Sequence, residues 1–269
     1  MFFLISGRID KNIFMKKTAI ITGATAGIGE ATAILLAKNN FNLVLTGRRK
    51  DRLEALKLQI KKELDCEILI LNFDIRNRNE VITAVESIPG KWQKIDVLIN
   101  NAGLAVGLNT LDMGEVDDWE RMIDTNIKGL LYITRLISPW MVNRGSGHIV
   151  NISSIAGKET YPSGNVYCAT KHAVQSLTKG MRLDMLKHGI KVSSVSPGAV
   201  DTEFSLVRFK GDAQRAKKVY DGFTPLNAKD VAETILFTVT RPAHVNIEDI
   251  LVMPTDQAYS RDFRRDENG

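Results

Sequence analysis

The chain has 269 residues, 44% of them hydrophobic, which is enough for one α/β domain with a sizeable core. Its 36 lysines and arginines outnumber its 31 aspartates and glutamates, so the net charge is +5 and the pI is near 9.1. The basic residues are interleaved with acidic ones and form no stripe with aromatic neighbours, which argues against nucleic-acid binding. A modest positive charge instead favours small anionic ligands.

Residues 1–14 look like an extension that precedes one α/β domain over residues 15–269. The apolar run at 1–5 is too short to span a membrane, and Arg8 interrupts it before a signal-peptide core develops. We therefore expect no membrane segment. Because Met15 directly precedes the first strand pattern, our hypothesis is that translation begins there. Mass spectrometry of endogenous protein beginning at Met1 would rule this out.

Two cysteines, Cys66 and Cys168, give no disulfide framework. The first borders a strand pattern and the second lies in a helical pattern, so we expect free thiols in a reducing cytoplasm. We expect no metal site.

Short apolar segments alternate with longer segments of helical period along the chain. The short ones predict strands at 18–22, 42–46, 67–72, 96–99, 148–153, 191–196 and 249–253, and the longer ones predict helices at 27–38, 51–63, 78–87, 117–143, 165–188 and 228–238. Runs such as VLIN and HIVNIS are typical of strands covered on both faces. This pattern predicts a single doubly wound (Rossmann) α/β domain with a parallel sheet of about seven strands, which binds ligands beyond the carboxyl ends of the strands.

A glycine turn connects the first predicted strand to the first helix. Gly23 permits a tight turn, Gly27 lets backbone amides approach a pyrophosphate, and Gly29 lets the helix pack close to the strand. The residues predicted to bind a dinucleotide here are Gly23, Thr25, Ala26, Gly27, Ile28 and Gly29. The spacing G-x-x-x-G-x-G differs from the usual G-x-G-x-x-G, and a purely structural turn is the alternative.

The end of the second predicted strand indicates the choice of dinucleotide. An NAD enzyme has an acidic residue at this position, about 20 residues past the glycines, but this chain has Gly47 followed by Arg48 and Arg49. A missing carboxylate next to guanidinium groups favours a 2′-phosphate, so we predict NADP(H) over NAD(H). Two solvated arginines in a loop are the alternative, more so for Arg49.

Polar residues also follow the third and fourth predicted strands. The run Asn100-Asn101-Ala102-Gly103 is small and hydrogen-bonding, which leaves room for the adenosine side of a cofactor, and Asn100, Ala102 and Gly103 are predicted to bind it. A plain turn is the competing interpretation. Asp74 follows the third strand, where an N-cap of the next helix is the alternative to a cofactor contact.

Tyr167 and Lys171 are four residues apart in a helical pattern and therefore project from one face. Ser154 ends the buried strand upstream. A phenol needs about 4 kcal/mol to ionise near pH ~7, and an ammonium roughly 4 Å away supplies a similar amount at an effective dielectric of about 20. Together the three groups predict proton exchange with an alcohol or carbonyl oxygen. The alternative is a half-buried tyrosine beside a solvated lysine.

Residues 201–225 are rich in lysine and arginine and contain glycines at 211 and 222, which is typical of a substrate lid. Within this segment, Arg208 and Lys210 are candidates to bind a substrate carboxylate. A solvated charge is the alternative for each of them.

These motifs together resemble the short-chain dehydrogenase/reductase family over about residues 16–254. The resemblance rests on Thr22 to Gly29, Asn100 to Gly103, Asn126, Ser154, Tyr167 with Lys171, and Pro197-Gly198 with Thr202. Further runs, including Gly47-Arg48-Arg49, Asp118 to Asn126 and Thr202 to Gly211, look like the NADP-dependent 3-hydroxy acid dehydrogenases of bacteria and fungi.

The resemblance implies a role for each matching residue. It implies that Tyr167 is the acid and base, that Lys171 lowers the tyrosine's pKa and binds the nicotinamide ribose, and that Ser154 orients the substrate oxygen. It also implies that Asp74 contacts adenine, that Asn126 holds a water in a proton relay, and that Pro197, Gly198 and Thr202 approach the nicotinamide carboxamide. Capping of the strand end is the alternative for Ser154, and satisfying buried backbone is the alternative for Asn126.

The implied function is hydride transfer between NADP(H) and serine, allo-threonine or 3-hydroxypropionate, or the matching 3-oxo acid or semialdehyde. One alternative is an NADPH-dependent ketoreductase of larger carbonyls such as 3-oxoacyl thioesters, which a wide apolar lid would favour. Another is a non-catalytic NADP-binding regulator, against which the intact Ser154, Tyr167 and Lys171 argue. The long apolar helices at 117–143 and 165–188 and the family resemblance imply a homotetramer.

Overall fold

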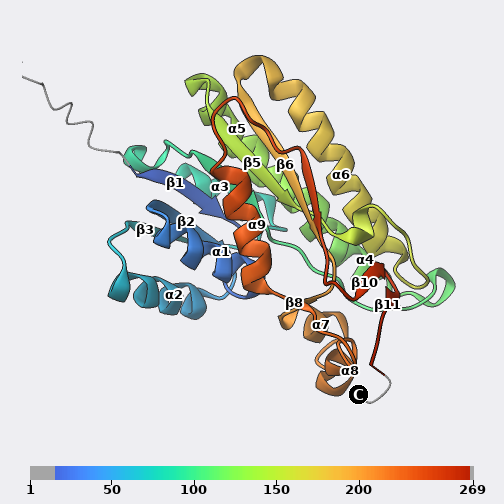
Figure 1. The fold of residues 1–269 in the computed structure, drawn as a ribbon. Coiled ribbons are helices and arrows are strands. Elements are labelled where there is room, and N and C mark those ends of the chain that lie inside the picture. Colours follow the sequence, from blue (N-terminus) through green and yellow to red (C-terminus); the bar gives the residue numbers. More distant parts are fainter. Residues whose placement is uncertain (1–15, 267–269) are drawn as a thin grey trace, which may run out of the picture.

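A computed structural model describes residues 16–266, so the predicted extension at 1–14 lies outside the described residues. Seven parallel strands form one sheet in the order β3-β2-β1-β4-β5-β6-β9. Their bounds are Lys17–Ile21 (β1), Phe41–Gly47 (β2), Ile68–Asn72 (β3), Val97–Asn100 (β4), Gly147–Ile152 (β5), Ile190–Pro197 (β6) and Asp249–Val252 (β9). The predicted doubly wound sheet is confirmed (Figure 1).

Helices cover both faces of the sheet. One face packs against α1 (Gly27–Lys38), α2 (Lys50–Glu63) and α9 (Ala228–Val239), and the other against α3 (Arg78–Glu86), α5 (Leu130–Arg144) and α6 (Asn165–Met185). Neighbouring strand residues point to opposite faces, so Ile21 joins the first core and Ile20 the second. This two-sided burial is why the strands read as continuous apolar runs.

The long helix predicted at 117–143 is wrong, because the structure divides it. α4 (Val116–Ile123) is followed by a π-helical segment, Asp124–Gly129, and only then by α5. A π-helix inserts an extra residue into a turn, and this change of hydrogen-bond register carries no signal in hydrophobic period. The helix predicted at 165–188 ends at Met185 and continues as a 3₁₀ turn, Leu186–His188.

Two small units lie beside the carboxyl ends of the strands. In the first, β7 (Val200–Asp201) pairs with β8 (Leu226–Asn227), and the chain between them forms α7 (Glu203–Arg208) and α8 (Ala213–Lys218). In the second, β10 (Gln257–Tyr259) and β11 (Asp262–Phe263) form an antiparallel hairpin. Figure 1 shows both units at the same end of the molecule.

Candidate active site

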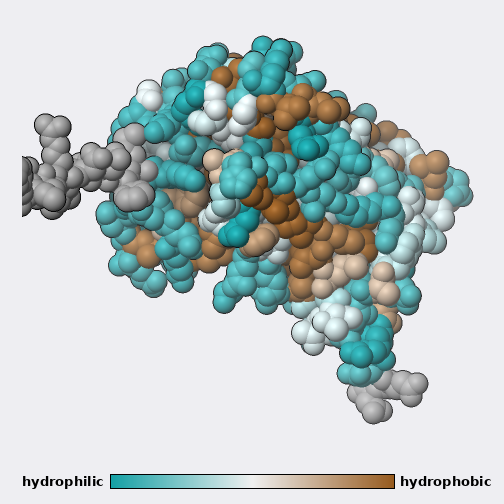
Figure 2. Space-filling model, turned by 45° about the horizontal axis from the view of Figure 1, so that its top comes forward, coloured by the Kyte–Doolittle hydropathy of each residue, from teal (hydrophilic) through white to brown (hydrophobic). Residues whose placement is uncertain are grey.

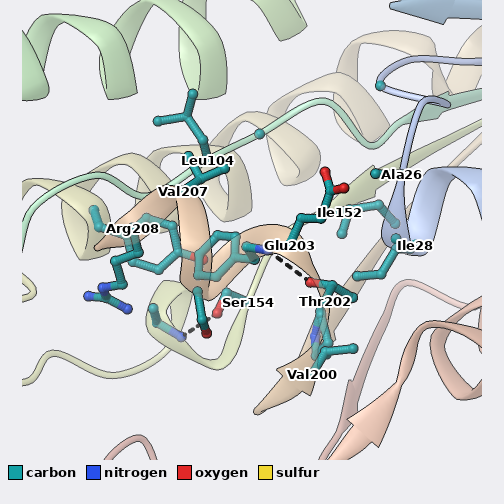
Figure 3. Close-up of a pocket in the computed structure, with 18 of the residues that line it drawn as sticks. Ala26, Ile28, Leu104, Ile152, Ser154, Val200, Thr202, Glu203, Val207 and Arg208 are labelled. Carbon is teal, nitrogen blue, oxygen red and sulfur yellow. Dashed lines mark hydrogen bonds between the residues drawn. The ribbon is translucent and has the colours of Figure 1, made fainter. Parts of the chain in front are cut away.

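One large cavity, of about 730 Å³, opens at the carboxyl ends of the strands. Its walls come from the turn after β1, the loops after β2 to β6, α7, α8 and the β10–β11 hairpin. Figure 3 shows Ala26 and Ile28 toward one end and Arg208 at the other, with Ser154 and Thr202 between them. The cavity therefore joins the glycine turn to the predicted catalytic residues.

The glycine turn forms the first end of this cavity with backbone atoms. Gly23 and Gly27 have φ angles of +68° and +55°, which side chains with a Cβ rarely adopt. A Cβ on Gly27 would lie 3.2 Å from Thr202 Cγ2 on the opposite wall, so a side chain there would narrow the cavity. Ala26 supplies no side-chain cap to α1, which leaves the first amides of the helix available to an anion.

The two arginines after β2 differ in how their donors are used. Arg49 donates to Thr25 Oγ1 and to the Thr25 carbonyl oxygen, and its Nη1 donates to Glu203 Oε2 at 2.9 Å. Within the described part of the chain, Arg48 makes one ion pair, at 3.7 Å from Asp74, and its side chain is 51% exposed. Arg48 thus keeps more free donors for a phosphate than Arg49 does.

Gly47 explains why no acidic residue ends β2. A Cβ at this position would lie 2.7 Å from Thr25 Cγ2, so the threonine of the glycine turn fills the space that a carboxylate side chain would need. The lack of space for a carboxylate side chain therefore favours a cofactor whose adenosine ribose is bound by guanidinium groups.

Asp74 lines the cavity but does not cap α3. Its carboxylate accepts hydrogen bonds from the backbone and side chain of Arg76, while Asn77 is the N-cap of the helix. Burial raises the pKa of Asp74, but the hydrogen bonds from Arg76 and the charges of Arg76 and Arg48 outweigh burial and leave it below the ordinary value. The capping interpretation is wrong, and the carboxylate stays ionised beside the cavity.

The run after β4 separates into two environments. Asn100 does not line the cavity; its side chain is buried in the sheet and donates to Thr134 Oγ1 and Asn151 Oδ1. Its side-chain amide is therefore used within the protein, and the cofactor contact of Asn100 stays a prediction. Asn101, Ala102 and Gly103 do line the cavity, and Asn101 fixes the glycine turn by donating to the Thr22 and Gly23 carbonyl oxygens.

Ser154, Tyr167 and Lys171 all line the middle of the cavity and are all buried. The Lys171 ammonium donates to the Ile152 carbonyl oxygen at 2.9 Å, at the end of β5. A Cβ on Gly103 would lie 3.3 Å from Lys171 Nζ, so this glycine leaves space beside the ammonium. Ser154 Oγ accepts from the Ala156 amide and caps a 3₁₀ turn, which orients its hydroxyl.

Asn126 lies in the π-helical segment, behind the cavity wall. Its Oδ1 accepts from the Leu104 amide at 2.9 Å, and its Nδ2 donates to the Leu104 carbonyl oxygen and to Thr170 Oγ1. Both side-chain donors are therefore used to hold the protein itself. A water relay at this position would therefore use main-chain atoms of the π-helical segment or the second lone pair of Asn126 Oδ1.

The two candidates for a substrate carboxylate have different surroundings. Arg208 lines the cavity, its Cζ lies 5.4 Å from the centre of the Tyr167 ring, and its buried Nε has no hydrogen-bond partner in residues 16–266. Lys210 does not line the cavity and forms an ion pair with Asp118 at 2.7 Å. The prediction for Lys210 is therefore contradicted, because a partner remote in sequence holds its ammonium outside the cavity.

Comparison with known proteins identifies the family. A family model described as short chain dehydrogenase matches residues 17–212. The chain belongs to the short-chain dehydrogenase family.

Several relatives agree with this short-chain dehydrogenase assignment over most of the chain. The NADP-dependent 3-hydroxy acid dehydrogenase YdfG of Salmonella typhi is 46% identical over 242 residues, which cover 90% of this chain and 96% of that protein. Sulfoacetaldehyde reductase 2 of Chromohalobacter salexigens is 41% identical, over 91% and 97% of the two chains. The closed form of serine dehydrogenase complexed with NADP+ has a TM-score of 0.87 and 42% identity, over 93% of this chain and all of that chain. The resemblance predicted from the sequence is confirmed.

The electrostatics of this short-chain dehydrogenase differ from the sequence-based expectation. Burial, with a smaller contribution from Tyr161, raises the pKa of the Tyr167 phenol above its ordinary value, and the Ser154 hydroxyl and the Arg208 charge oppose this shift. Burial also lowers the pKa of Lys171 to about 8. The expectation that one lysine nearly suffices to acidify the tyrosine undervalues the cost of desolvating the phenolate, which is the largest influence here.

The C-terminal hairpin also contributes to the cavity of this short-chain dehydrogenase, which no sequence pattern predicts. Gln257 Oε1 accepts from the Ala199 amide and so supports the turn at Pro197 and Gly198, which lines the cavity. Arg261 lies in the cavity wall, with its Cζ 4.8 Å from the centre of the Tyr161 ring. The only signal in the sequence was a basic run next to Phe263, which gives no hint of a long-range contact.

Within residues 16–266, no helix is long and apolar enough to cross a membrane. The same part of the chain holds no group of three His, Cys, Asp or Glu side chains arranged to bind a metal ion.

Proposed function

We propose that this protein transfers a hydride between NADP(H) and a small 3-hydroxy acid, or the matching 3-oxo acid or semialdehyde. The candidate substrates are serine, allo-threonine, 3-hydroxypropionate and malonic semialdehyde. The observation that carries the proposal is the position of Arg208, a cation 5.4 Å from the Tyr167 ring in the same cavity as the glycine turn. Relatives at 41–46% identity that are named for hydroxy acid or sulfoacetaldehyde chemistry support it.

The cofactor is NADP(H), and the residues of the cavity fit it. The first amides of α1 and the glycines at 23 and 27 would hold the diphosphate, and Arg48 would hold the 2′-phosphate. Asp74 would lie at the adenine, and Pro197, Gly198 and Thr202 at the nicotinamide end. When bound, the nicotinamide ring supplies or accepts the hydride.

The protein supplies the proton. Tyr167 would exchange a proton with the substrate oxygen, and Ser154 would hold that oxygen by a hydrogen bond. Because burial keeps the phenol protonated, Tyr167 is ready to donate in the direction of carbonyl reduction. Lys171, with a pKa near 8, is still mostly charged at pH 7, and the space left by Gly103 would admit a ribose hydroxyl beside it.

The segment at 201–225 would act as a lid over the substrate. The short β7–β8 pair joins its two ends, and its helices α7 and α8 supply cavity residues including Glu203, Phe204 and Arg208. Phe204 packs against Tyr167 with ring centres 5.7 Å apart, so movement of this segment would open the catalytic centre.

We further propose a cytoplasmic homotetramer. Figure 2 shows hydrophobic residues gathered in a band across one face, bordered by hydrophilic ones. Large apolar side chains are exposed on α6 and α9, including Leu183 at 72% and Phe237 at 47%, and β9 exposes Leu251 at 40%. Contacts between subunits would bury such surfaces.

A substrate panel tests the proposed function. Serine, allo-threonine, 3-hydroxypropionate and malonic semialdehyde are each assayed in the suitable direction with NADP(H) and with NAD(H), beside a 3-oxoacyl thioester. We expect turnover of the small acids with NADP(H). Preference for the thioester would favour a ketoreductase of larger carbonyls, and binding of NADPH without any turnover would favour a regulator.

A further inference from the structure

Two guanidinium groups from distant parts of the chain contact the same tyrosine in the cavity wall. Arg208, on α7, donates from Nη2 to the Tyr161 hydroxyl at 2.7 Å, and its Cζ lies 5.5 Å from the ring centre. Arg261, in the turn between β10 and β11, lies over the same ring at 4.8 Å. Both arginines line the cavity and place two cations against Tyr161, and Arg208 also lies over the Tyr167 ring.

This pair carries uncompensated positive charge. Neither arginine has a carboxylate within 4.0 Å in the described part of the chain, whereas Arg49 pairs with Glu203 and Arg48 with Asp74. The Nε of Arg208 is buried without a hydrogen-bond partner among residues 16–266. Arg208 is half-buried and Arg261 is exposed; a half-buried cation without a counter-charge is costly, and two neighbouring cations repel each other.

The electrostatics of Arg261 agree with this description. Burial lowers its pKa, and although Tyr161 opposes the shift, the positive charge of Arg208 adds to it. An anion bound near both guanidinium groups would offset the cost of desolvating them and would reduce the repulsion between them.

The hairpin holds Arg261 in place rather than leaving it on a loose tail. The Ser260 amide and hydroxyl both donate to Glu159 Oε2 at 2.9 Å, which anchors the turn to the loop after β5. On the other side, Phe263 packs against Phe223 of the lid segment with ring centres 4.6 Å apart. Arg261 is therefore fixed between the body of the domain and the lid.

We propose that Arg261 and Arg208 together bind the acid group of the substrate and make the enzyme selective for acids over neutral alcohols. This inference rests on the proposed function. The position of Arg208 near the Tyr167 ring suits an acid group one methylene from the reacting carbon, as in 3-hydroxypropionate. Two guanidinium groups offer more donors than one carboxylate can accept in bidentate fashion, so a sulfonate with three oxygens fits the same position.

The corresponding sulfonate substrate is 2-hydroxyethanesulfonate, which has the same spacing as 3-hydroxypropionate. In its oxidation the carbinol C–H bond breaks and its hydride passes to NADP+, while the hydroxyl proton leaves through Tyr167. The products are the 2-oxoethanesulfonate aldehyde, NADPH and a proton, so atoms and charges balance.

The test compares Arg261→Gln with the wild type on three alcohols at saturating NADP+: 3-hydroxypropionate, 2-hydroxyethanesulfonate and the uncharged methyl ester of 3-hydroxypropionate. We expect Arg261→Gln to lower kcat/KM for both anions about 10- to 100-fold, mainly through KM, and to change the ester less than about threefold. Arg261→Lys should recover part of the loss, because it restores the charge without the planar donors.

Arg264→Gln is the matched control. This arginine lies in the same tail and pairs with Asp256, but it does not line the cavity, so all three rates should stay within about twofold of the wild type. The dissociation constant of NADP+ should also be unchanged in every variant.

Three results would overturn the inference or part of it. If Arg261→Gln lowered kcat/KM equally for the two anions and the ester, or did not lower it, Arg261 would not recognise the charge of the substrate. Lack of sulfonate oxidation by a wild type that oxidises 3-hydroxypropionate would exclude the sulfonate. If the wild type turned over none of the three alcohols, the proposed function would fail instead. The affinity for malonate in the presence of NADP+, measured by calorimetry, would then still test the arginine pair. Weaker binding by Arg261→Gln than by the wild type would support the pair, and equal binding would exclude it.

Discussion

The two ends of the cavity are built in different ways. The end proposed to bind the dinucleotide is built from main-chain geometry: a turn with two glycines at positive φ, the open first turn of α1, and strand ends with small residues. The end proposed to bind the substrate is built from long side chains on three separate segments, the loop at Tyr161, the helix α7 and the C-terminal hairpin.

This difference has a consequence for specificity. Main-chain sites bind groups that all dinucleotides share, whereas side chains can be exchanged without disturbing the sheet. One side chain connects the two ends: Glu203 of α7 accepts hydrogen bonds from Arg49 and also from Arg52, at 2.6 Å. The start of the proposed lid segment is thus tied to the loop that we propose discriminates NADP from NAD.

The largest expected effect is a loss of catalysis at the substrate end without a comparable loss of dinucleotide binding. Tyr167→Phe should lower kcat about 1000-fold or more, because general acid and base catalysis contributes up to about four orders of magnitude. The dissociation constant of NADPH should change less than about threefold, since the dinucleotide end keeps its main-chain contacts. Stopped-flow turnover and fluorescence titration of NADPH would measure the two quantities.

Tyr161→Phe is the control for this prediction. It removes the hydroxyl that accepts a hydrogen bond from Arg208 but keeps the ring. Its decrease in kcat should therefore be at least 30-fold smaller than that of Tyr167→Phe. Full activity of Tyr167→Phe would end the assignment of the acid and base.

A smaller effect concerns a charged side chain at the proposed dinucleotide end. Arg48→Gln should reduce the ratio of kcat/KM for NADP+ to that for NAD+ about 30- to 100-fold, because it removes charge-assisted hydrogen bonds to the 2′-phosphate. Arg49→Gln should reduce the ratio less, since the Arg49 donors already bind Thr25 and Glu203. Arg48→Asp should reverse the preference. An unchanged preference in Arg48→Asp, or a larger effect at Arg49, would contradict this ranking.

The same difference explains what the sequence could predict. The hydrophobic pattern predicts all seven strands to within one residue of their ends, and the glycines predict the turn after β1, because strand period and turn chemistry are local properties. The interruption at Asp124–Gly129 was missed, because a π-helical segment does not change the hydrophobic pattern. The family resemblance indicates Asn126, but only the folded structure shows that its side chain accepts a hydrogen bond from the Leu104 amide.

The differences between prediction and structure at both ends of the cavity have a common physical cause. Lys210 was proposed for the substrate because its charge lies in the lid segment, yet Asp118 binds it. Arg261 received no role, although it reaches a tyrosine one hundred residues earlier in the chain. Asn100 likewise turns from the cavity to Thr134 and Asn151. Each outcome depends on a pairing between distant segments, which composition and spacing do not encode.

The smallest expected effect involves Lys171, which lies where the two ends meet. Its pKa in the folded protein is about 8, below the value of about 10.4 for an unfolded chain, so the unfolded state binds more protons between these pH values. The burial cost is therefore fully present below pH ~8 and is relieved as the pH rises. Between pH ~7.5 and ~9.5, this residue should add about 2 kcal/mol to the free energy of unfolding.

Lys171→Met isolates this contribution, because methionine has similar length and no charge. Urea unfolding at several pH values should show that the stability of the wild type relative to Lys171→Met rises by about 2 kcal/mol over that interval. Lys229→Met, at a side chain that is 73% exposed, should give a curve parallel to the wild type. Parallel curves for Lys171→Met as well would mean that the ammonium is hydrated in the folded protein. Water would then reach the part of the cavity where its two ends meet, and desolvation would not raise the pKa of Tyr167.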